Sequence, residues 1–187
     1  MQVFYLLCNH DVYRFRFFTI YDYSLAFTLF LTIKTVKQSS NYMRKVEATT
    51  SINCSSRIVI QAFTDYKLLR DWWNVERCLI DKKEGGLYTL TWGITATGFK
   101  YVSTGTIKKY NPENRLFIEN FIYLSTDKPI LGPMFLSINA EEVKGGSNVF
   151  LCQDGYQNGK DWDWYYNAVN EAWPQMLQKL KTYIENK

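Results

Sequence analysis

The sequence predicts an α+β domain over residues 43–187, in which a curved antiparallel sheet lies under a long C-terminal helix. Segments of alternating apolar and polar residues follow one another between residues 87 and 156, separated by turn residues. Such a series is typical of antiparallel strands that bury one face and expose the other to solvent. From residue 160 to residue 186 apolar residues instead recur every three or four positions, which is the period of one helix face.

The domain opens with one strand and two short helices. Residues 44–53 alternate well enough for a strand, and Ser55 and Ser56 are natural N-caps for the helical pattern that follows. Residues 66–73 (YKLLRDWW) then predict a second short helix. Two helices between the first strand and the second form an uncommon opening, which narrows the choice of topology.

The predicted strands form a meander. They are residues 87–94, 100–110, 115–124, 134–143 and 147–156. Pro112 and Asn114 supply turn chemistry between the second and third of them, Gly145 and Gly146 join the last two, and residues 125–133 are expected to form a loop.

The final helix is expected to cross the whole sheet. Its apolar stripe consists of Tyr166, Val169, Trp173, Met176, Leu177, Leu180 and Ile184. These spacings predict about seven turns with one face buried, and such a helix is long enough to cover every strand.

Composition excludes several classes of function. Residues 43–187 carry 18 basic and 16 acidic side chains, scattered along the chain, so no nucleic-acid-binding surface is expected. The four cysteines are far apart and the single histidine is His10, so no zinc site and no cofactor are expected. The cysteine usage favours a reduced, cytoplasmic protein, although a Cys54–Cys152 bridge stays an alternative.

Residues 1–42 differ in composition from the rest of the chain. They are rich in Phe, Tyr, Leu, Ile and Thr, and they keep neither a helical nor a strand period. Asp22 interrupts the most apolar stretch, residues 17–33, which argues against a membrane anchor there. The favoured interpretation is translated upstream sequence with Met43 as the true start, and a genuine extension is the alternative.

Short motifs in a fixed order carry a resemblance to a known family. They are residues 52–65 (INCSSRIVIQAFTD), 72–73 (WW), 85–88 (GGLY), 105–107 (GTI), 110–112 (YNP) with Leu116, 155–156 (GY), and 172–174 (AWP) with Leu177, Leu180 and Lys181. This set resembles the START-like (SRPBCC, birch-pollen-allergen-like) superfamily, and within it the branch of the activator of heat-shock-protein-ninety ATPase homologues. Ser56 stands where that family often has proline, and Ala172 stands in place of its usual glycine.

The resemblance implies a helix-grip fold with a hydrophobic cavity between the sheet and the last helix. It implies no single function, because members bind lipids, hormones or polyketides, assist chaperones, or catalyse cyclisation. The leading hypothesis is therefore a non-catalytic domain that binds a small hydrophobic or aromatic molecule. The alternatives are a co-chaperone-like interaction module acting on a heat-shock-protein ATPase, and a polyketide-cyclase-like enzyme.

Aromatic residues make up 17% of the chain, and those on the strands and the last helix are the candidate ligand-binding residues. The candidates are Trp73, Tyr88, Leu90, Trp92, Phe121, Tyr123, Trp164, Trp173 and Met176. The alternative is that these side chains simply fill a core. Because neighbours on a helix point about 100° apart, Trp73 is expected to face the cavity and Trp72 to cover the surface.

No catalytic set stands out. Glu119 and Glu76 are the acids that could point into the cavity, and Glu119 with Tyr88 or Tyr123 is the pairing that an enzyme would need. Asp161 and Asp163, together with Glu171, invite an acid–base interpretation. The two aspartates, however, suit the first turn of a helix better, where carboxylates complement the helix dipole.

Overall fold

The computed structural model describes residues 44–187. In chain order its elements are β1 (Arg44–Ile52), α1 (Ser56–Ala62), α2 (Tyr66–Trp73), β2 (Arg77–Ile80), β3 (Leu87–Thr95), β4 (Gly98–Asn111), β5 (Arg115–Ser125), β6 (Lys128–Val143), β7 (Gly146–Tyr156) and α3 (Lys160–Glu185). The predicted α+β class and order are confirmed. The expectations for residues 1–42, including the extension and the anchor at 17–33, lie outside the described residues.

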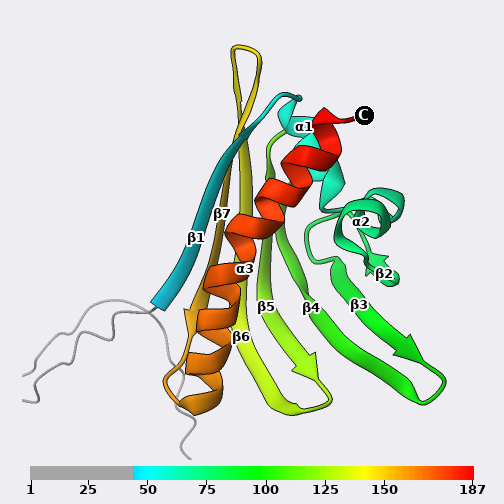
Figure 1. Cartoon of the computed structure of the whole chain (residues 1–187), viewed down its shortest axis with the longest axis vertical. Coiled ribbons are helices and arrows are strands. Elements are labelled where there is room, and N and C mark those ends of the chain that lie inside the picture. Colours follow the sequence, from blue (N-terminus) through cyan, green and yellow to red (C-terminus); the bar gives the residue numbers. More distant parts are fainter. Residues whose placement is uncertain (1–43) are drawn as a thin grey trace, which may run out of the picture. The chain divides into compact units, whose positions relative to one another are not determined.

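The strands form one antiparallel sheet in the order β1-β7-β6-β5-β4-β3-β2. Helix α3 crosses one face of this sheet diagonally and ends near α1 and α2, while the opposite face carries no helix (Figure 1). The helix continues through Pro174 to Glu185. It packs mainly against β1 and less against β6 and β7, so it diverges from the sheet toward β3 and β4. Within residues 44–187 no helix is long and apolar enough to cross a membrane.

Two parts of the sheet differ from the prediction. Strand β2 has only four residues, too few for alternation to reveal it, and it pairs with β3 through Arg77 and Thr91. The segment expected to be a loop is instead a hairpin, because β6 already begins at Lys128 and pairs there with Ser125. Pro129 and Pro133 favoured a loop, but proline is accommodated where strand pairing is irregular, as it is here.

A β-bulge in β5 sets which side chains face α3. Leu116 and Ile118 are fully buried, and the regular pairing with β6 then shifts between Ile118 and Phe121. Asn120 takes a left-handed conformation with φ 52° inside this bulge. The extra residue resets the alternation, so that Phe121 and Tyr123 lie on the inner face.

Strand β4 approaches the bulge closely at a glycine. A Cβ atom on Gly105 would lie 2.6 Å from Cγ2 of Ile118 and 2.9 Å from the carbonyl oxygen of Glu119. Only glycine fits this contact without a shift of β5. Gly105 therefore helps to hold the bulge, and with it the inner positions of Phe121 and Tyr123.

The two short helices begin with different kinds of cap, and Ser55 occupies the N-cap position of α1 as predicted. The side chain of Ser55 makes no capping bond at α1. Instead the backbone N–H of Ser56 donates to Oε1 of Glu142 on β6 at 2.7 Å, which ties the start of α1 to the sheet. At α2 the carboxylate of Asp65 accepts from the N–H groups of Lys67 and Leu68, a regular N-cap.

Candidate functional site

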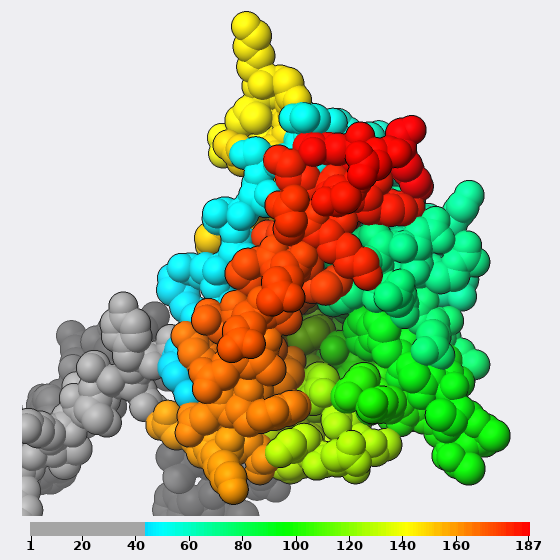
Figure 2. All heavy atoms as spheres, in the orientation of Figure 1, coloured from blue at the N-terminus to red at the C-terminus, as the bar shows by residue number. Residues whose placement is uncertain are grey.

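A cavity of about 260 Å³ lies between the inner face of the sheet and the middle of α3. Figure 2 shows the hollow on this side, between the orange part of α3 and the green strands. Strands β3, β4, β5 and β7 supply its floor, and α2 and α3 its walls. The lining residues are Trp73, Trp92, Tyr101, Ser103, Phe121, Tyr123, Gln153, Tyr165, Val169, Ala172 and Trp173.

Five of the nine candidate ligand-binding residues line this cavity. They are Trp73, Trp92, Phe121, Tyr123 and Trp173. The tryptophan rings are packed against one another, with the Trp73 centroid 5.4 Å from that of Trp92 and 5.5 Å from that of Trp173. The Trp92 indole N–H donates to the backbone oxygen of Trp73 at 3.2 Å, which fixes the orientation of its ring. The structure therefore brings an aromatic cluster to one wall.

The other four candidates lie elsewhere. Tyr88 and Leu90 are fully buried in the core below the cavity, and the Tyr88 hydroxyl donates to the carbonyl oxygen of Phe63 at 3.1 Å. Met176 is half-buried against the core one turn beyond the cavity. Trp164 is 42% exposed. Its centroid lies 6.5 Å from that of Tyr123, so it flanks the lining without being part of it.

The prediction for the tryptophan pair of α2 is half wrong. Trp73 lines the cavity, as expected. Trp72 does not cover the surface, because its ring is only 1% exposed and its indole N–H donates to the carbonyl oxygen of Ala62 at 2.8 Å. Helix α2 is packed against both α1 and α3, so two neighbouring side chains are covered at once.

A buried polar network lies beside the aromatic wall, and the sequence interpretation missed it. The Gln153 amide is 1% exposed on β7. Its Oε1 accepts from the Trp173 indole N–H at 3.0 Å, and its Nε2 donates to the Tyr165 hydroxyl at 3.2 Å. The only sequence signal was the inward register of Gln153, which follows the buried residues Val149 and Leu151 at every second position of β7.

The Tyr165 hydroxyl is the buried hydroxyl that the cavity offers to a ligand, and the hydroxyl of Ser103 also lines the cavity. Tyr165 lines the cavity, and its oxygen already accepts a hydrogen bond from Gln153. Within residues 44–187 no acceptor for its own proton is found. Burial raises the pKa of this phenol well above its usual value, so the group stays protonated and is a donor at neutral pH.

Tyrosines on β4 and β5 form the outer part of the lining. The rings of Tyr101 and Tyr123 are stacked with centroids 6.2 Å apart, and Tyr123 lies 4.6 Å from Tyr165. Burial also raises the pKa of Tyr123. Ser103 and the exposed Ala172 complete the lining and are small. The cavity is thus narrow, mostly apolar, and flanked by aromatic faces.

The acids considered for catalysis are placed elsewhere. Glu119 lies in the bulge beside Asn120 and faces the opposite side of the sheet, where its carboxylate pairs with Lys108 at 3.3 Å. Oε1 and Oε2 of Glu76 accept from the N–H groups of Gly93 and Ile94 at 2.7 and 2.8 Å. The suggested pairing of Glu119 with Tyr88 or Tyr123 is therefore wrong, because the bulge was not visible in the alternation.

The remaining reactive groups have structural roles. Asp161 pairs with Lys128 at 3.3 Å and Asp163 with Arg44 at 2.6 Å, both in the first turn of α3 as expected. The cysteines of the described part, Cys54, Cys78 and Cys152, are unbridged, and burial raises the pKa of each thiol. Residues 44–187 hold no cluster of side chains suited to a metal ion.

Comparison with known proteins agrees with this architecture. Residues 53–185 match the sequence profile described as activator of Hsp90 ATPase homolog 1-like protein. No curated protein matches the sequence. Among solved structures, protein MLL2253 from Mesorhizobium loti is similar with a TM-score of 0.61 and 16% identity, covering 77% of this chain and 98% of that one.

Two further solved structures share the fold. ChR145 from Cytophaga hutchinsonii has a TM-score of 0.58 and 24% identity, with 76% of this chain and 94% of that chain covered. The Aha1 dimer from Colwellia psychrerythraea has a TM-score of 0.55 and 17% identity, with coverage of 74% and 94%. Since the profile spans most of the chain and the helix-grip topology agrees, this chain belongs to the activator of Hsp90 ATPase homolog 1-like family of the START-like superfamily.

Proposed function

We propose that this domain binds a small, flat, hydrophobic molecule in the cavity between the sheet and α3, without catalysis. The observation that carries the proposal is the lining itself, with three tryptophan rings and two stacked tyrosines around an open volume. Aromatic faces offer large contact areas at a small cost in side-chain entropy. Such a pocket, with few polar groups, is the usual form of a small-molecule site.

The size of the cavity limits the ligand. Its volume of about 260 Å³ lies just below the range of about 300–1,000 Å³ typical of ligand pockets. A lipid with a long chain would therefore exceed it. The volume suits a molecule of two fused rings, which can lie against the ring of Trp73 or Trp173.

One polar contact is expected to orient this molecule. The Tyr165 hydroxyl has a proton without an acceptor among the described residues, and it stays protonated because burial raises its pKa. A ligand carbonyl or ether oxygen could accept that proton. The favoured ligand is therefore a two-ring aromatic with one hydrogen-bond acceptor.

A matched pair of probes tests this. We expect 2-acetylnaphthalene to quench the tryptophan fluorescence of the domain with saturation, because three indoles line the site. 2-Isopropenylnaphthalene has a similar shape but no carbonyl oxygen, and it should bind about tenfold more weakly. Tyr165→Phe should remove this difference between the probes while leaving binding of the second probe unchanged.

Two alanines on α3 supply a matched control. Ala172 lines the cavity, whereas the exposed Ala168 one turn earlier does not. Ala172→Phe should block saturable quenching and Ala168→Phe should not. Equal quenching of all variants by both probes, or no saturation with either, would contradict the proposal.

A second candidate function is an interaction module acting on a heat-shock-protein ATPase, favoured by the family profile that residues 53–185 match. It would act through the surface and not through the cavity. The test is the ATPase rate of a purified Hsp90-type protein with and without this chain. A rise in that rate which survives Ala172→Phe would favour the interaction module over the ligand-binding role.

A further inference from the structure

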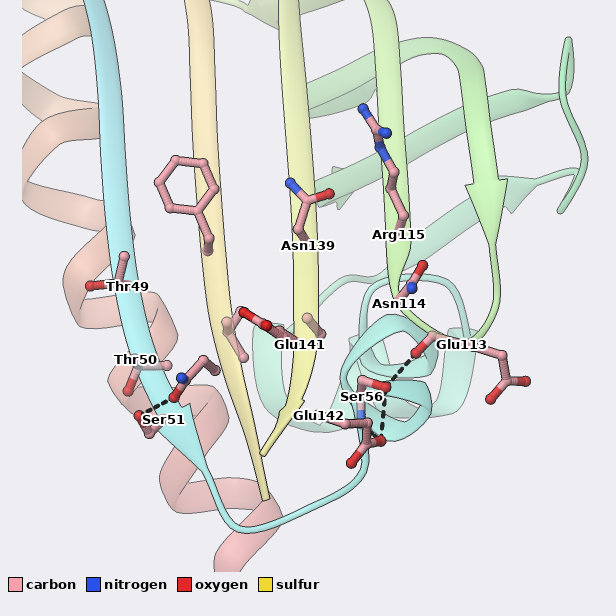
Figure 3. A pocket seen from close by; sticks show the side chains of 14 residues that line it. Thr49, Thr50, Ser51, Ser56, Glu113, Asn114, Arg115, Asn139, Glu141 and Glu142 are labelled. Atoms are coloured by element: carbon pink, nitrogen blue, oxygen red, sulfur yellow. Dashed lines mark hydrogen bonds between the residues drawn. The ribbon is translucent and has the colours of Figure 1, made fainter. Parts of the chain in front are cut away.

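The face of the sheet opposite α3 carries a second, broader hollow. It has a volume of about 1030 Å³ and lies between the β6–β7 hairpin, the β4–β5 turn and the start of α1. Figure 3 shows polar side chains of four strands and of the β4–β5 turn arranged around it. The sheet separates this outer hollow from the cavity under α3, so the two sites are independent.

Strand register places one aromatic ring among polar side chains. Arg115 on β5 pairs with Asn139 on β6, Asn139 pairs with Phe150 on β7, and Phe150 pairs with Thr49 on β1. These four side chains form a row across the outer face, as the residues directly opposite in neighbouring strands lie close together. Phe150 is 38% exposed, so its ring is open to a ligand.

Several polar groups at this hollow have no partner among residues 44–187. The guanidinium of Arg115, the side-chain amide of Asn114 and the carboxylate of Glu141 make no hydrogen bond or ion pair there. Asn139 donates its amide to the Ser137 hydroxyl at 3.1 Å, and its own amide oxygen accepts nothing. The hollow thus offers both donors and acceptors.

The charges at the hollow nearly cancel. Glu142 is held by the N–H and the hydroxyl of Ser56, with distances of 2.7 and 2.8 Å, and Glu113 pairs with Arg57 at 3.2 Å. The neutral donors of Ser56 leave the Glu142 carboxylate charged, so Glu141 and Glu142 are balanced only by the guanidinium of Arg115, and the hollow carries a net charge of about −1. A ligand that suits this arrangement is neutral, with donors and acceptors of its own.

We propose that this outer hollow binds a neutral oligosaccharide. A sugar hydroxyl donates and accepts at once, so a row of hydroxyls can satisfy guanidinium, carboxylate and amide groups together. The apolar C–H face of a pyranose ring can lie on the Phe150 ring, as apolar groups do on aromatic faces.

Other ligand classes fit less well. A nucleic acid or free phosphate would meet the carboxylates of Glu113, Glu141 and Glu142. An extended peptide adds to a free sheet edge; β5, β6 and β7 are each paired on both sides, and β1 alone among the strands at the hollow lies at a sheet edge.

The test is a ¹⁵N NMR titration of the full chain with cellohexaose and, separately, maltohexaose. We expect at least one of them to shift the amides of Asn139, Glu141 and Phe150 with a Kd below about 1 mM. The amides of the α3 cavity, such as that of Ala172, should not shift.

Two phenylalanines on the same sheet face give a matched control. Phe135 on β6 is 39% exposed, nearly the same as Phe150, but it is stacked on Phe117 and does not line the outer hollow. Phe150→Ala should weaken binding about tenfold and Phe135→Ala should leave it unchanged. If Phe150→Ala does not fold, the exposed Arg115→Ala should give the same loss.

Three outcomes would overturn the proposal. The first is the absence of shifts with either saccharide at about 10 mM, a concentration that would half-saturate even a very weak site. The second is equal weakening by Phe150→Ala and Phe135→Ala. The third is a set of shifts confined to α3.

Discussion

The hydrogen-bond network of Gln153 makes a quantitative prediction about stability. Gln153→Leu keeps the volume and the burial of the side chain, so it opens no cavity. It removes the acceptor for the Trp173 indole N–H at 3.0 Å and the donor to the Tyr165 hydroxyl at 3.2 Å. Trp173 is 6% exposed and Tyr165 also 6%, so water cannot easily replace the lost partner.

The magnitude follows from these two contacts. A buried donor left without an acceptor costs about 1–3 kcal/mol. The indole N–H has no second acceptor among the described residues, whereas the Tyr165 hydroxyl can still rotate toward the cavity. We therefore expect the free energy of unfolding to fall by about 2–4 kcal/mol, most of it from the orphaned indole. A double variant that also carries Trp173→Phe should lose less stability than the sum of the losses in the two single variants.

Urea unfolding of a double-mutant cycle measures this. Gln153→Leu, Trp173→Phe and the double variant should share one m-value, and the coupling energy between the two sites should be about 1–2 kcal/mol. A Gln153→Leu variant as stable as the parent would refute the reasoning. So would a coupling energy within about 0.5 kcal/mol of zero, because the two side chains would then not depend on each other.

Three further predictions concern stability. Burial raises the pKa of Tyr88 and Tyr165 in the folded state above the unfolded value near 10, so stability should hold below about pH 10 and then fall by about 1.4 kcal/mol per pH unit for each tyrosine; an alkaline loss of stability that is as steep in Tyr88→Phe and Tyr165→Phe as in the parent would contradict this. Gly105→Ala should cost about 1–3 kcal/mol in thermal unfolding, because its Cβ would overlap β5, and an unchanged melting temperature would show that the strand can shift freely. Glu142→Gln should lower stability by about 1 kcal/mol by weakening the charge-assisted bonds to Ser56, and it should cost less in a Ser56→Ala background, where only the backbone N–H bond remains; a Glu142→Gln variant as stable as the parent would contradict this.

The fold could be predicted from the sequence because its signals are long. The last helix keeps its stripe over more than twenty residues, and most strands alternate over about ten. The short strand β2 has four residues and gives no usable period. The hairpin from Ser125 to Lys128 was not predicted, because Pro129 and Pro133 are of a residue type that favours turns. In this protein both prolines lie within β6, where strand pairing is irregular.

The candidate site was only half predictable, because alternation fails at irregular positions. Strand β5 reads as one continuous pattern, in which Phe117, Glu119 and Phe121 share a face. The bulge at Asn120 breaks that pattern, sending Glu119 to Lys108 outside and Phe121 to the cavity inside. A single residue in a left-handed conformation thus decided whether the cavity contained an acid.

Whether an aromatic side chain lines the cavity or fills the core depends on depth, which the period of a strand does not report. Tyr88 and Trp92 share the inner face of β3, yet Tyr88 is fully buried against Phe63 and Trp92 reaches the cavity. What separates them is the divergence of α3 from β3 and β4, a property of how the layers pack. The role of the polar residue Gln153 was likewise not predictable from the strand period alone. Its inward register was readable from β7, but its role follows only from the proximity of Trp173 and Tyr165 on α3. A polar residue at an inward strand position opposite an aromatic helix stripe is therefore the signal to search for in related sequences.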